Sequence, residues 1–282
     1  MKIPARVEIV PFPSGKRMAV TTSFDDGQDS DRRIVAAFNE WGLKGTFNLN
    51  SGILGRTGIP TPDGARRPLD RSEVADVYRG HEVAIHTTSH PWLHRLDPSQ
   101  IATEVLEDRK VLEDLVGYPV RGMAYPFGAY DARVVEILRA LGIVYCRTCH
   151  NVAPCFPPQE PLLFGTTMHQ YATGPTVPEL FEQLYGNPRY SGVFYPWGHG
   201  FEFHDRQDWA GLERIFKPLS GKPDVWYCTN LELFDYEDAR KRMIIAANRA
   251  TAYNPSAITV TLSVDGTLVD VPGGKLVSLV RE

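Results

Sequence analysis

Two adjacent carboxylates and three histidines could together hold a metal ion and move protons. They are Asp25, Asp26, His86, His90 and His199. Two histidines and one carboxylate are a common ligand set for a divalent ion such as zinc, and they leave a position open for water and substrate. A second carboxylate can then act as a general base, and a third histidine as a general acid. These residue types predict a metal-dependent hydrolase.

Short apolar runs alternate with amphipathic segments along most of the chain. The runs predict β-strands at residues 18–24, 45–50, 82–88, 120–127, 143–148, 161–168, 191–197 and 224–230. Helices are expected after a Ser30 cap, at roughly 70–79, from an Asp97 cap, and near 131–141, 177–185, 206–217 and 232–249. Strands that alternate with helices imply a parallel sheet with right-handed crossovers. The sequence therefore predicts an α/β barrel of about seven strands.

The polar residues fall where predicted strands end. Such ends occur at Asp25-Asp26, at His86, at Tyr125-Pro126-Phe127 and at Trp197-Gly198-His199. The active site of an α/β barrel lies at the carboxyl ends of its strands, so these side chains should meet on one rim. Neighbouring residues of an extended chain point in different directions. One aspartate of the pair could therefore bind a metal while the other acts on water.

The last part of the chain has a different pattern. Residues 257–272 alternate β-branched and polar residues around Asp265-Gly266, which predicts a β-hairpin. We expect residues 1–250 to form the barrel and residues 251–282 to form a small β extension. That this extension is a contact in a homo-oligomer is a hypothesis that rests on its position alone.

Composition excludes several classes of protein. The 282 residues carry a formal net charge of −4, from 34 acidic and 30 basic residues, and the longest basic run is Arg240-Lys241-Arg242. Nucleic acid and anionic membranes are therefore not expected as partners. No apolar stretch approaches the roughly 18 residues needed to span a bilayer, and the first sixteen residues show no signal-peptide pattern. We expect a cytoplasmic protein that acts on a small molecule or an oligosaccharide.

Four segments resemble the successive motifs of one enzyme family. SFDDG (23–27), HTTSH (86–90), YPFG (125–128) and WGHGFEF (197–203) are similar to the motifs of the polysaccharide deacetylases, the NodB-homology family of carbohydrate esterases. The resemblance spans roughly residues 16–240. It implies a deformed (β/α) barrel and a metal-dependent hydrolase that removes the acetyl group from an N-acetylated sugar or oligosaccharide.

The resemblance also implies a role for each matching residue. Asp25 would be the base that deprotonates the attacking water, and His199 would be the acid that protonates the leaving group. The metal ligands would be Asp26, His86 and His90. Zinc is the expected ion, with cobalt, nickel or manganese as alternatives. The residues expected to bind substrate are Tyr125, Trp197 and Phe127, the last through a backbone N–H that stabilises the oxyanion.

The sequence departs from the family pattern in three ways. Ala124 stands where many members carry an arginine that pairs with the base, and Arg121 and Arg147 are two candidates to replace it. No Asp-x-x-Asp-Trp segment is found, so Glu202 is a candidate to adjust the acid His199. The expected cytoplasmic location also fits poorly with a cell-wall substrate.

Other functions remain open from the residues. Cys146-Arg147-Thr148-Cys149-His150 has the spacing of covalent haem attachment, and with Cys155 it could form a zinc cluster. The barrel could instead cleave small cyclic or linear amides, as in the allantoinase-like branch of the superfamily. It could also be a non-catalytic carbohydrate-binding barrel, with Trp92, Tyr130 and Trp197 stacking on sugar rings.

Overall fold

An eight-stranded parallel sheet forms the centre of the molecule in the computed structural model, which describes residues 3–56, 59–61, 64–151 and 156–280. In sheet order its strands are β10 (Phe164–Thr166), β9 (Tyr145–Asn151), β8 (Gly122–Ala124), β7 (Glu82–Ile85), β4 (Thr46–Leu49), β3 (Ser23–Asp25), β13 (Pro196–His199) and β11 (Met168–His169). Only Thr167 separates β10 from β11, the two end strands. The sheet therefore closes through one chain segment, and the predicted α/β barrel of about seven strands is confirmed.

A second parallel sheet extends the barrel beneath β3 and β13. It contains β12 (Gly192–Phe194), β2 (Met18–Val20) and β14 (Val225–Tyr227), in that order. The chain runs from β2 into β3 and from β12 into β13. Two stretches of chain therefore pass from the three-stranded sheet into the eight-stranded sheet. The predicted strand 18–24 is thus divided at Thr21-Thr22, where β14 ends and β4 takes its place beside the chain.

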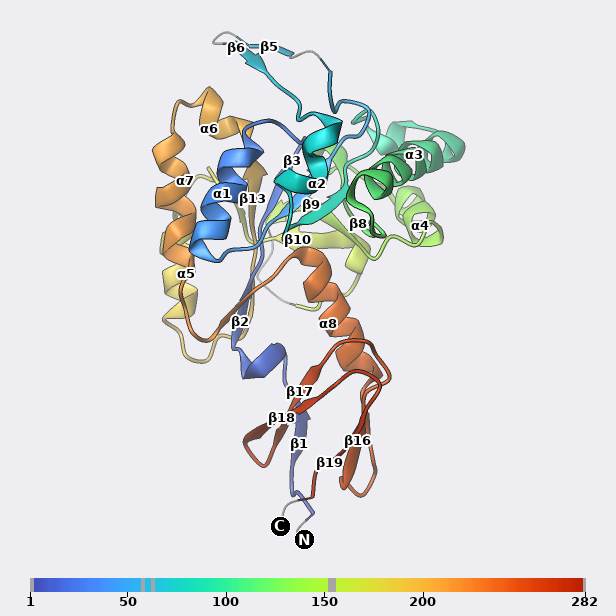
Figure 1. The fold of residues 1–282 in the computed structure, drawn as a ribbon, viewed down its shortest axis with the longest axis vertical. Coiled ribbons are helices and arrows are strands. Elements are labelled where there is room, and N and C mark those ends of the chain that lie inside the picture. Colours follow the sequence, from blue (N-terminus) through green and yellow to red (C-terminus); the bar gives the residue numbers. More distant parts are fainter. Residues whose placement is uncertain (1–2, 57–58, 62–63, 152–155, 281–282) are drawn as a thin grey trace.

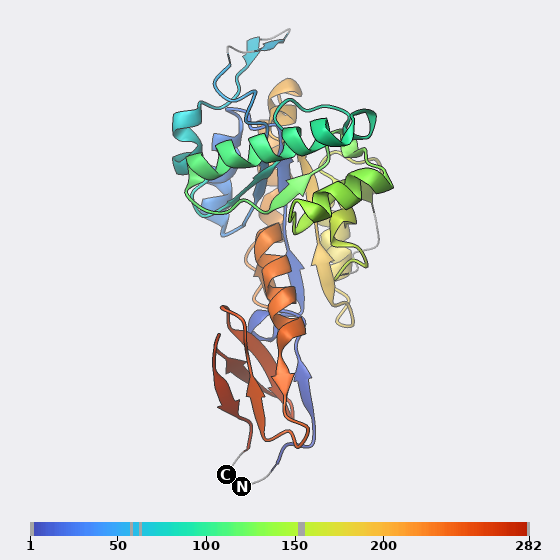
Figure 2. The same ribbon diagram turned by 90° about the vertical axis from the view of Figure 1, so that its right-hand side faces the viewer.

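Most of the helices lie around the barrel, and the last one runs from beneath it toward the C-terminal strands (Figures 1 and 2). The helices are α1 (Asp31–Trp41), α2 (Val74–Val77), α3 (Pro98–Val116), α4 (Ala132–Ala140), α5 (Val177–Tyr185), α6 (Phe201–Asp205), α7 (Trp209–Phe216) and α8 (Asn230–Arg242). Short 3-10 helices cover Pro13–Gly15, Arg71–Glu73, Leu93–Arg95, Pro126–Gly128, Pro161–Leu163 and Lys217–Leu219. Within the described ranges, no helix has the length and apolar character that crossing a membrane would require.

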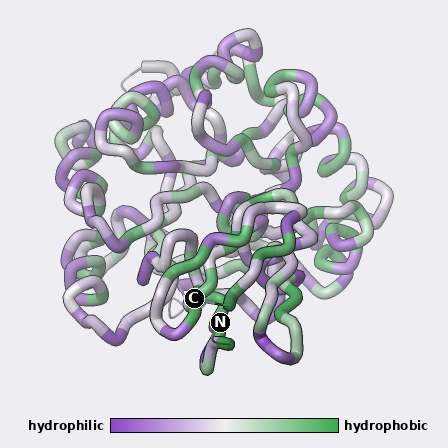
Figure 3. The backbone as a smooth tube through the Cα atoms, turned by 60° about the horizontal axis from the view of Figure 1, so that its bottom comes forward, coloured by the Kyte–Doolittle hydropathy of each residue, from purple (hydrophilic) through white to green (hydrophobic). Residues whose placement is uncertain are grey.

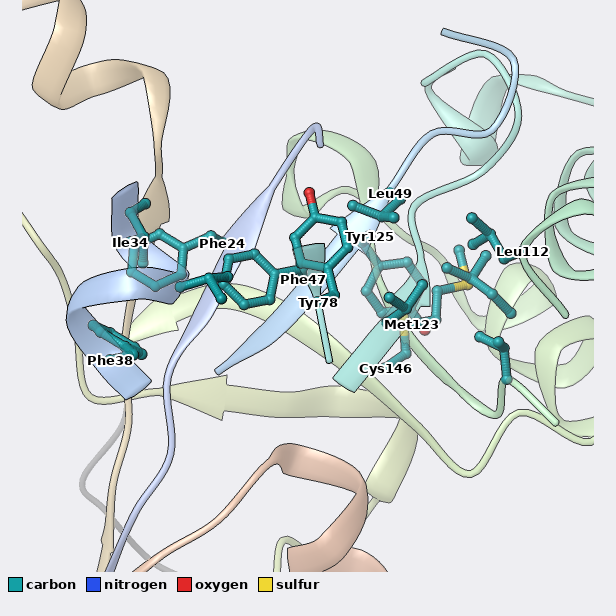
Figure 4. Packing of buried hydrophobic residues seen from close by; sticks show 14 of the residues in the cluster. Phe24, Ile34, Phe38, Phe47, Leu49, Tyr78, Leu112, Met123, Tyr125 and Cys146 are labelled. Atoms are coloured by element: carbon teal, nitrogen blue, oxygen red, sulfur yellow. The ribbon is translucent and has the colours of Figure 1, made fainter. Parts of the chain in front are cut away.

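Helix ends and buried faces follow the sequence pattern closely in α3 and α1. The Asp97 side chain accepts hydrogen bonds from the backbone N–H groups of Ser99 and Gln100, so it caps α3 as predicted. The apolar face of α1 packs on the barrel, where Phe38 and Phe47 lie 5.7 Å and 5.6 Å from the Phe24 ring (Figure 4). These contacts fix the strand that carries Asp25.

Three predictions about helices are wrong in detail. Ser30 has helical backbone angles and makes no capping hydrogen bond, so α1 begins without a side-chain cap. The segment predicted as one helix at 206–217 contains only α7, and α6 precedes it. The helix predicted near 232–249 ends at Arg242, because Ile244-Ile245 forms strand β15 and pairs with β16 (Thr251–Tyr253). Tertiary pairing outweighs helical propensity there.

A small β unit lies at the end of the molecule opposite the β5–β6 hairpin (Ile59–Thr61 and Gly64–Arg66). One of its sheets contains β1 (Val7–Ile9), β17 (Val260–Val264) and β18 (Thr267–Val271), and the other contains β15 (Ile244–Ile245), β16 and β19 (Leu276–Ser278). The predicted hairpin is present: β17 and β18 pair around Asp265-Gly266, both with positive φ. The two sheets share a buried apolar core, and several strands of this unit are strongly hydrophobic in Figure 3. The N-terminal strand β1 therefore belongs to the unit as well.

Candidate active site

Sheet register places three polar residues in one row at the carboxyl end of the barrel. Asp25 on β3 is the register partner of Asn48 on β4 and of His199 on β13. Register partners on adjacent parallel strands point to the same face of the sheet. The Asn48 side-chain amide accordingly donates to Asp25 Oδ1 over 2.8 Å, and His199 Nε2 lies 4.0 Å from Asp25 Oδ2.

Three metal-type donors converge beside this row. Nε2 of His86 and Nε2 of His90 each lie 3.8 Å from Asp26 Oδ1. Asp26 and His90 both have positive φ, at 79° and 58°, a costly conformation for residues other than glycine. The backbone thus holds two of the three donors in strained turns, which is common at functional sites.

The chemistry of these donors fits a divalent ion. His86 Nδ1 lies 2.8 Å from the carbonyl oxygen of Ala124, so this nitrogen carries the proton and donates it, leaving the Nε2 lone pair directed at Asp26. Burial lowers the pKa of His86 to about 4, so the ring is neutral at neutral pH, as a metal ligand must be. Asp26, His86 and His90 could therefore hold one ion between them.

A buried carboxylate on α3 supports His86, and sequence reasoning missed it. Asp108 Oδ2 accepts the backbone N–H of His86 over 3.1 Å, and Oδ1 accepts that of Ser51 over 2.7 Å. Asp108 is fully buried, and burial raises its pKa to about 7. The segments that follow β4 and β7 are thus both hydrogen-bonded to the Asp108 side chain. The only sequence signal was a charged residue on the buried face of a predicted helix.

Arg147 supplies the positive charge that Ala124 lacks. Ala124 on β8 and Arg147 on β9 are register partners, so the arginine occupies the same level of the barrel on the next strand. Its guanidinium donates to Asp25 Oδ2, and both side chains are buried. Burial disfavours ionisation of Asp25, but Arg147 and the neighbouring histidines outweigh it and hold the pKa at about 2. The other candidate, Arg121, pairs with Asp235 instead.

Glu202 links two histidines at the opposite side of the row. Its Oε1 lies 3.5 Å from His199 Nδ1 and its Oε2 lies 3.2 Å from His169 Nε2, while the Gln170 amide donates to Oε2 over 2.6 Å. Burial alone would lower the pKa of His199, but Glu202 and the carboxylates of Asp25 and Asp26 raise it. His169 and Gln170 were missed, because neither belongs to a motif and only the pairing of β11 with β13 brings them here.

Aromatic side chains line part of the rim. Phe127 is 51% exposed and stacks on Trp92 with ring centroids 4.2 Å apart, and its edge faces the His90 ring at 4.4 Å. Trp197 lies over the Arg147 guanidinium, 4.4 Å from ring centroid to Cζ. Tyr125, by contrast, is fully buried, and its hydroxyl donates to the Leu162 carbonyl. The prediction that its side chain binds substrate is therefore wrong.

The cysteine motif lies on strand β9. Cys146 is completely buried in the main core, and Cys149 is half-buried with its Sγ 3.4 Å from an Arg147 nitrogen. The first thiol of a haem attachment motif has to be accessible, so the buried position of Cys146 does not fit that alternative. Cys155, the further ligand of the suggested zinc cluster, lies outside the described residues.

The barrel thus carries a cluster of carboxylates and histidines at the carboxyl ends of its strands. Residues 13–146 match the family model described as polysaccharide deacetylase. This match spans slightly less than half of the 282 residues, and it confirms that this part of the chain resembles the family, as the sequence motifs there predict.

Individual relatives agree with this resemblance. The chain is similar to the peptidoglycan-N-acetylglucosamine deacetylase PgdA of Listeria monocytogenes, with 28% identity over 139 residues, which is 48% of this chain and 27% of the relative. It is also similar to chitin deacetylase 1 of Cryptococcus neoformans, with 34% identity over 79 residues, or 27% and 17% of the two chains. The aligned region therefore covers about a quarter or less of these two relatives.

A solved structure shares the fold over most of the chain. A protein of Mycobacterium smegmatis, proposed to be a polysaccharide deacetylase, aligns with a TM-score of 0.59 and 18% identity, covering 85% of this chain and 96% of that one. At this level of identity the likeness establishes the common fold.

Proposed function

We propose that this protein is a divalent-metal-dependent hydrolase that removes the acetyl group from an N-acetylated sugar or oligosaccharide. One relationship carries the proposal. A buried, ionised carboxylate, Asp25, stands between a metal-type donor set and a histidine that is favoured in its protonated form. Hydrolysis of an amide needs these three functions together: an activated water, a base and an acid for the leaving nitrogen.

Asp26, His86 and His90 would hold the ion, with zinc expected and cobalt, nickel or manganese as alternatives. Bound there, a divalent ion lowers the pKa of water and polarises a carbonyl oxygen. Asp25 takes the proton of the attacking water, and Arg147 keeps this carboxylate ionised until it does. His199 donates its proton to the leaving nitrogen, and the Phe127 backbone N–H stabilises the oxyanion. Acetate and a free amine are the products.

The exposed aromatic pair favours a saccharide over a small cyclic amide. Trp92 and Phe127 are 38% and 51% exposed and stack in parallel beside His90. Flat exposed aromatic faces offer apolar contact area to sugar rings. This observation favours an N-acetylated saccharide as substrate over the small amides of the allantoinase-like alternative. The predicted acid and base favour either hydrolase over a non-catalytic binding barrel.

The test is release of acetate from N-acetylated oligosaccharides by purified protein supplied with zinc or cobalt. Wild-type protein should release acetate, and Asp25→Asn should release roughly 100- to 10,000-fold less, which is the range that general-base catalysis contributes. Turnover of hydantoin-type cyclic amides without any acetate release would favour the small-amide alternative. Loss of both activities in a metal-loaded, folded protein would contradict the hydrolase proposal.

A further inference from the structure

A pocket of about 310 Å³ adjoins the candidate active site and carries more positive than negative side chains. Its wall includes three arginines, Arg32, Arg33 and Arg67, and one aspartate, Asp29. The chain as a whole has a net charge of −4, so this local excess of positive charge runs against the balance of the molecule. The volume lies at the lower end of the range of small-molecule sites, about 300–1,000 Å³.

The pocket touches the active site from two sides. Gln28 forms part of its wall, and the Gln28 side-chain amide donates to the Asp26 carbonyl oxygen over 3.4 Å. Phe201 lies on another side, with its ring centroid 4.9 Å from that of His199. Helices α1, α6 and α7, which carry most of the wall, lie together on one flank of the barrel (Figure 1). A molecule bound in the pocket would therefore contact residues that themselves touch Asp26 and His199.

Two of the three arginines have no carboxylate partner among the described residues. Arg32 is neutralised, since Nε lies 2.7 Å from Asp29 Oδ1 and Nη2 lies 2.5 Å from Glu73 Oε2. Arg33 instead places its guanidinium over the ring of Trp209, with Cζ 3.9 Å from the centroid. Arg67 is exposed at the pocket; its backbone oxygen accepts the N–H of Asp29 over 2.7 Å, and its side chain has no hydrogen-bond partner among the residues that the structure describes.

Unpaired guanidinium groups recognise oxyanions. Arginine presents several N–H donors in a planar fork that matches a carboxylate or a phosphate, and stacking on an aromatic ring fixes the direction of that fork. Stacking leaves the edges of the Arg33 guanidinium available to donate. A neutral saccharide would leave both positive charges without a counter-charge.

From this geometry we infer that the pocket is a subsite for an acidic substituent on the saccharide. The substituent is an oxyanion, a carboxylate or a phosphate ester, bound by Arg33 and Arg67. It is carried by a sugar ring next to the one whose N-acetyl group is hydrolysed. This inference rests on the proposed function and narrows its substrate class to acidic N-acetylated saccharides.

The experiment compares matched disaccharides with metal-loaded protein. One carries two N-acetyl groups and a carboxylate, the second is its methyl ester, and the third carries a phosphate ester in place of the carboxylate. Wild-type protein should have a KM at least about tenfold lower for an acidic substrate than for the ester, as charge-assisted hydrogen bonds imply. Of the carboxylate and the phosphate-ester disaccharide, the one with the lower KM identifies the oxyanion that the pocket prefers. The preference should shrink as salt rises, because ions screen exposed charges.

The arginine variants test the assignment. In Arg33→Gln/Arg67→Gln the ratio of KM for the ester to KM for the acidic substrate should fall to about one. Arg189→Gln, which removes an exposed charge from the loop between α5 and β12, should keep the wild-type ratio. Equal KM values in the wild type, or a ratio that survives in the double variant, would overturn the inference.

Calorimetric titration separates this inference from the proposed function. Binding of the acidic disaccharide is measured directly, with wild-type protein and with the double variant. Wild-type binding that the double variant loses would support the subsite even if no saccharide released acetate. Acetate release without any preference for the acidic substrates would leave the proposed function standing and overturn the subsite.

Discussion

Arg147 and Asp25 form a buried ion pair at the centre of the candidate active site, and the arginine comes from the strand next to Ala124. Asn48 holds the other carboxylate oxygen, and Trp197 covers the guanidinium. The Asp25 carboxylate, the proposed base, is thus held on both oxygens and kept ionised. This pair gives the first of five predictions.

Arg147→Gln should leave Asp25 buried without its positive partner. Breaking a buried pair from one side costs about 3–5 kcal/mol. The pKa of Asp25 should rise above its present value of about 2, and the acidic limb of the kcat/KM profile should move to higher pH. The loss of folding stability comes from a buried charge without a partner. It should therefore be larger at pH 7.5 than at pH 4.5, where the Asp25 carboxyl can bind a proton. Denaturant unfolding at the two pH values measures it.

Arg121→Gln is the matched control. Arg121 pairs with Asp235 at a partly exposed site, so its loss should cost at most about 1 kcal/mol and leave the pH profile unchanged. Equal effects of the two substitutions would mean that Arg147 has no special relation to the base.

Glu202→Gln should lower the pKa of His199. Glu202 favours the protonated ring, so its removal should shift the alkaline limb of kcat/KM to lower pH. The profile should be compared with that of Glu213→Gln, whose carboxylate pairs with Lys217 on the surface. An unshifted alkaline limb would show that Glu202 does not act on the acid.

Metal content should depend on Asp26, His86 and His90, and not on His169. Wild-type protein should bind about one divalent ion per chain, and His86→Ala/His90→Ala should lose it. His169→Ala should retain it, although His169, His199 and Glu202 form a second group of ligand-type side chains. Elemental analysis of the purified proteins decides between the two groups, and the opposite pattern would move the ion to His169.

Asp108→Asn should destabilise the rim. Both carboxylate oxygens of Asp108 accept backbone N–H groups, whereas asparagine has only one accepting oxygen, so one of the two N–H groups is left without a partner. The cost should be about 1–3 kcal/mol, the penalty of an unsatisfied buried donor. Asp114→Asn, on the exposed side of the same helix, should be nearly neutral in calorimetry. Similar melting temperatures for the two variants would contradict the assigned support of His86.

Trp92→Ala should weaken substrate binding more than turnover. It removes the ring that stacks on Phe127 beside His90, so KM for an N-acetylated oligosaccharide should rise about three- to tenfold, as expected for a lost aromatic contact of about 0.5–1.5 kcal/mol. Trp92→Phe should restore most of the affinity. If kcat fell while KM stayed constant, the pair would have a role other than holding the sugar.

The amino-acid sequence by itself determined the fold class and most of the residues of the candidate site. Alternating strand and helix periodicity predicted the barrel, and Asp25, Asp26, His86, His90 and His199 each follow or end a predicted strand. Such information is local, because a strand end and the few polar residues after it are contiguous in the chain. The cap of α3 and the Asp265-Gly266 hairpin were predictable for the same reason.

Only the tertiary structure decided which distant side chains meet. It selected Arg147 over Arg121 through the β8–β9 register, and it brought His169 to Glu202 through the pairing of β11 with β13. It also buried Tyr125 in the core and ended α8 at Arg242. Register between strands and burial depend on contacts far apart in the chain. A local pattern carries no information about which of two arginines will face a given carboxylate.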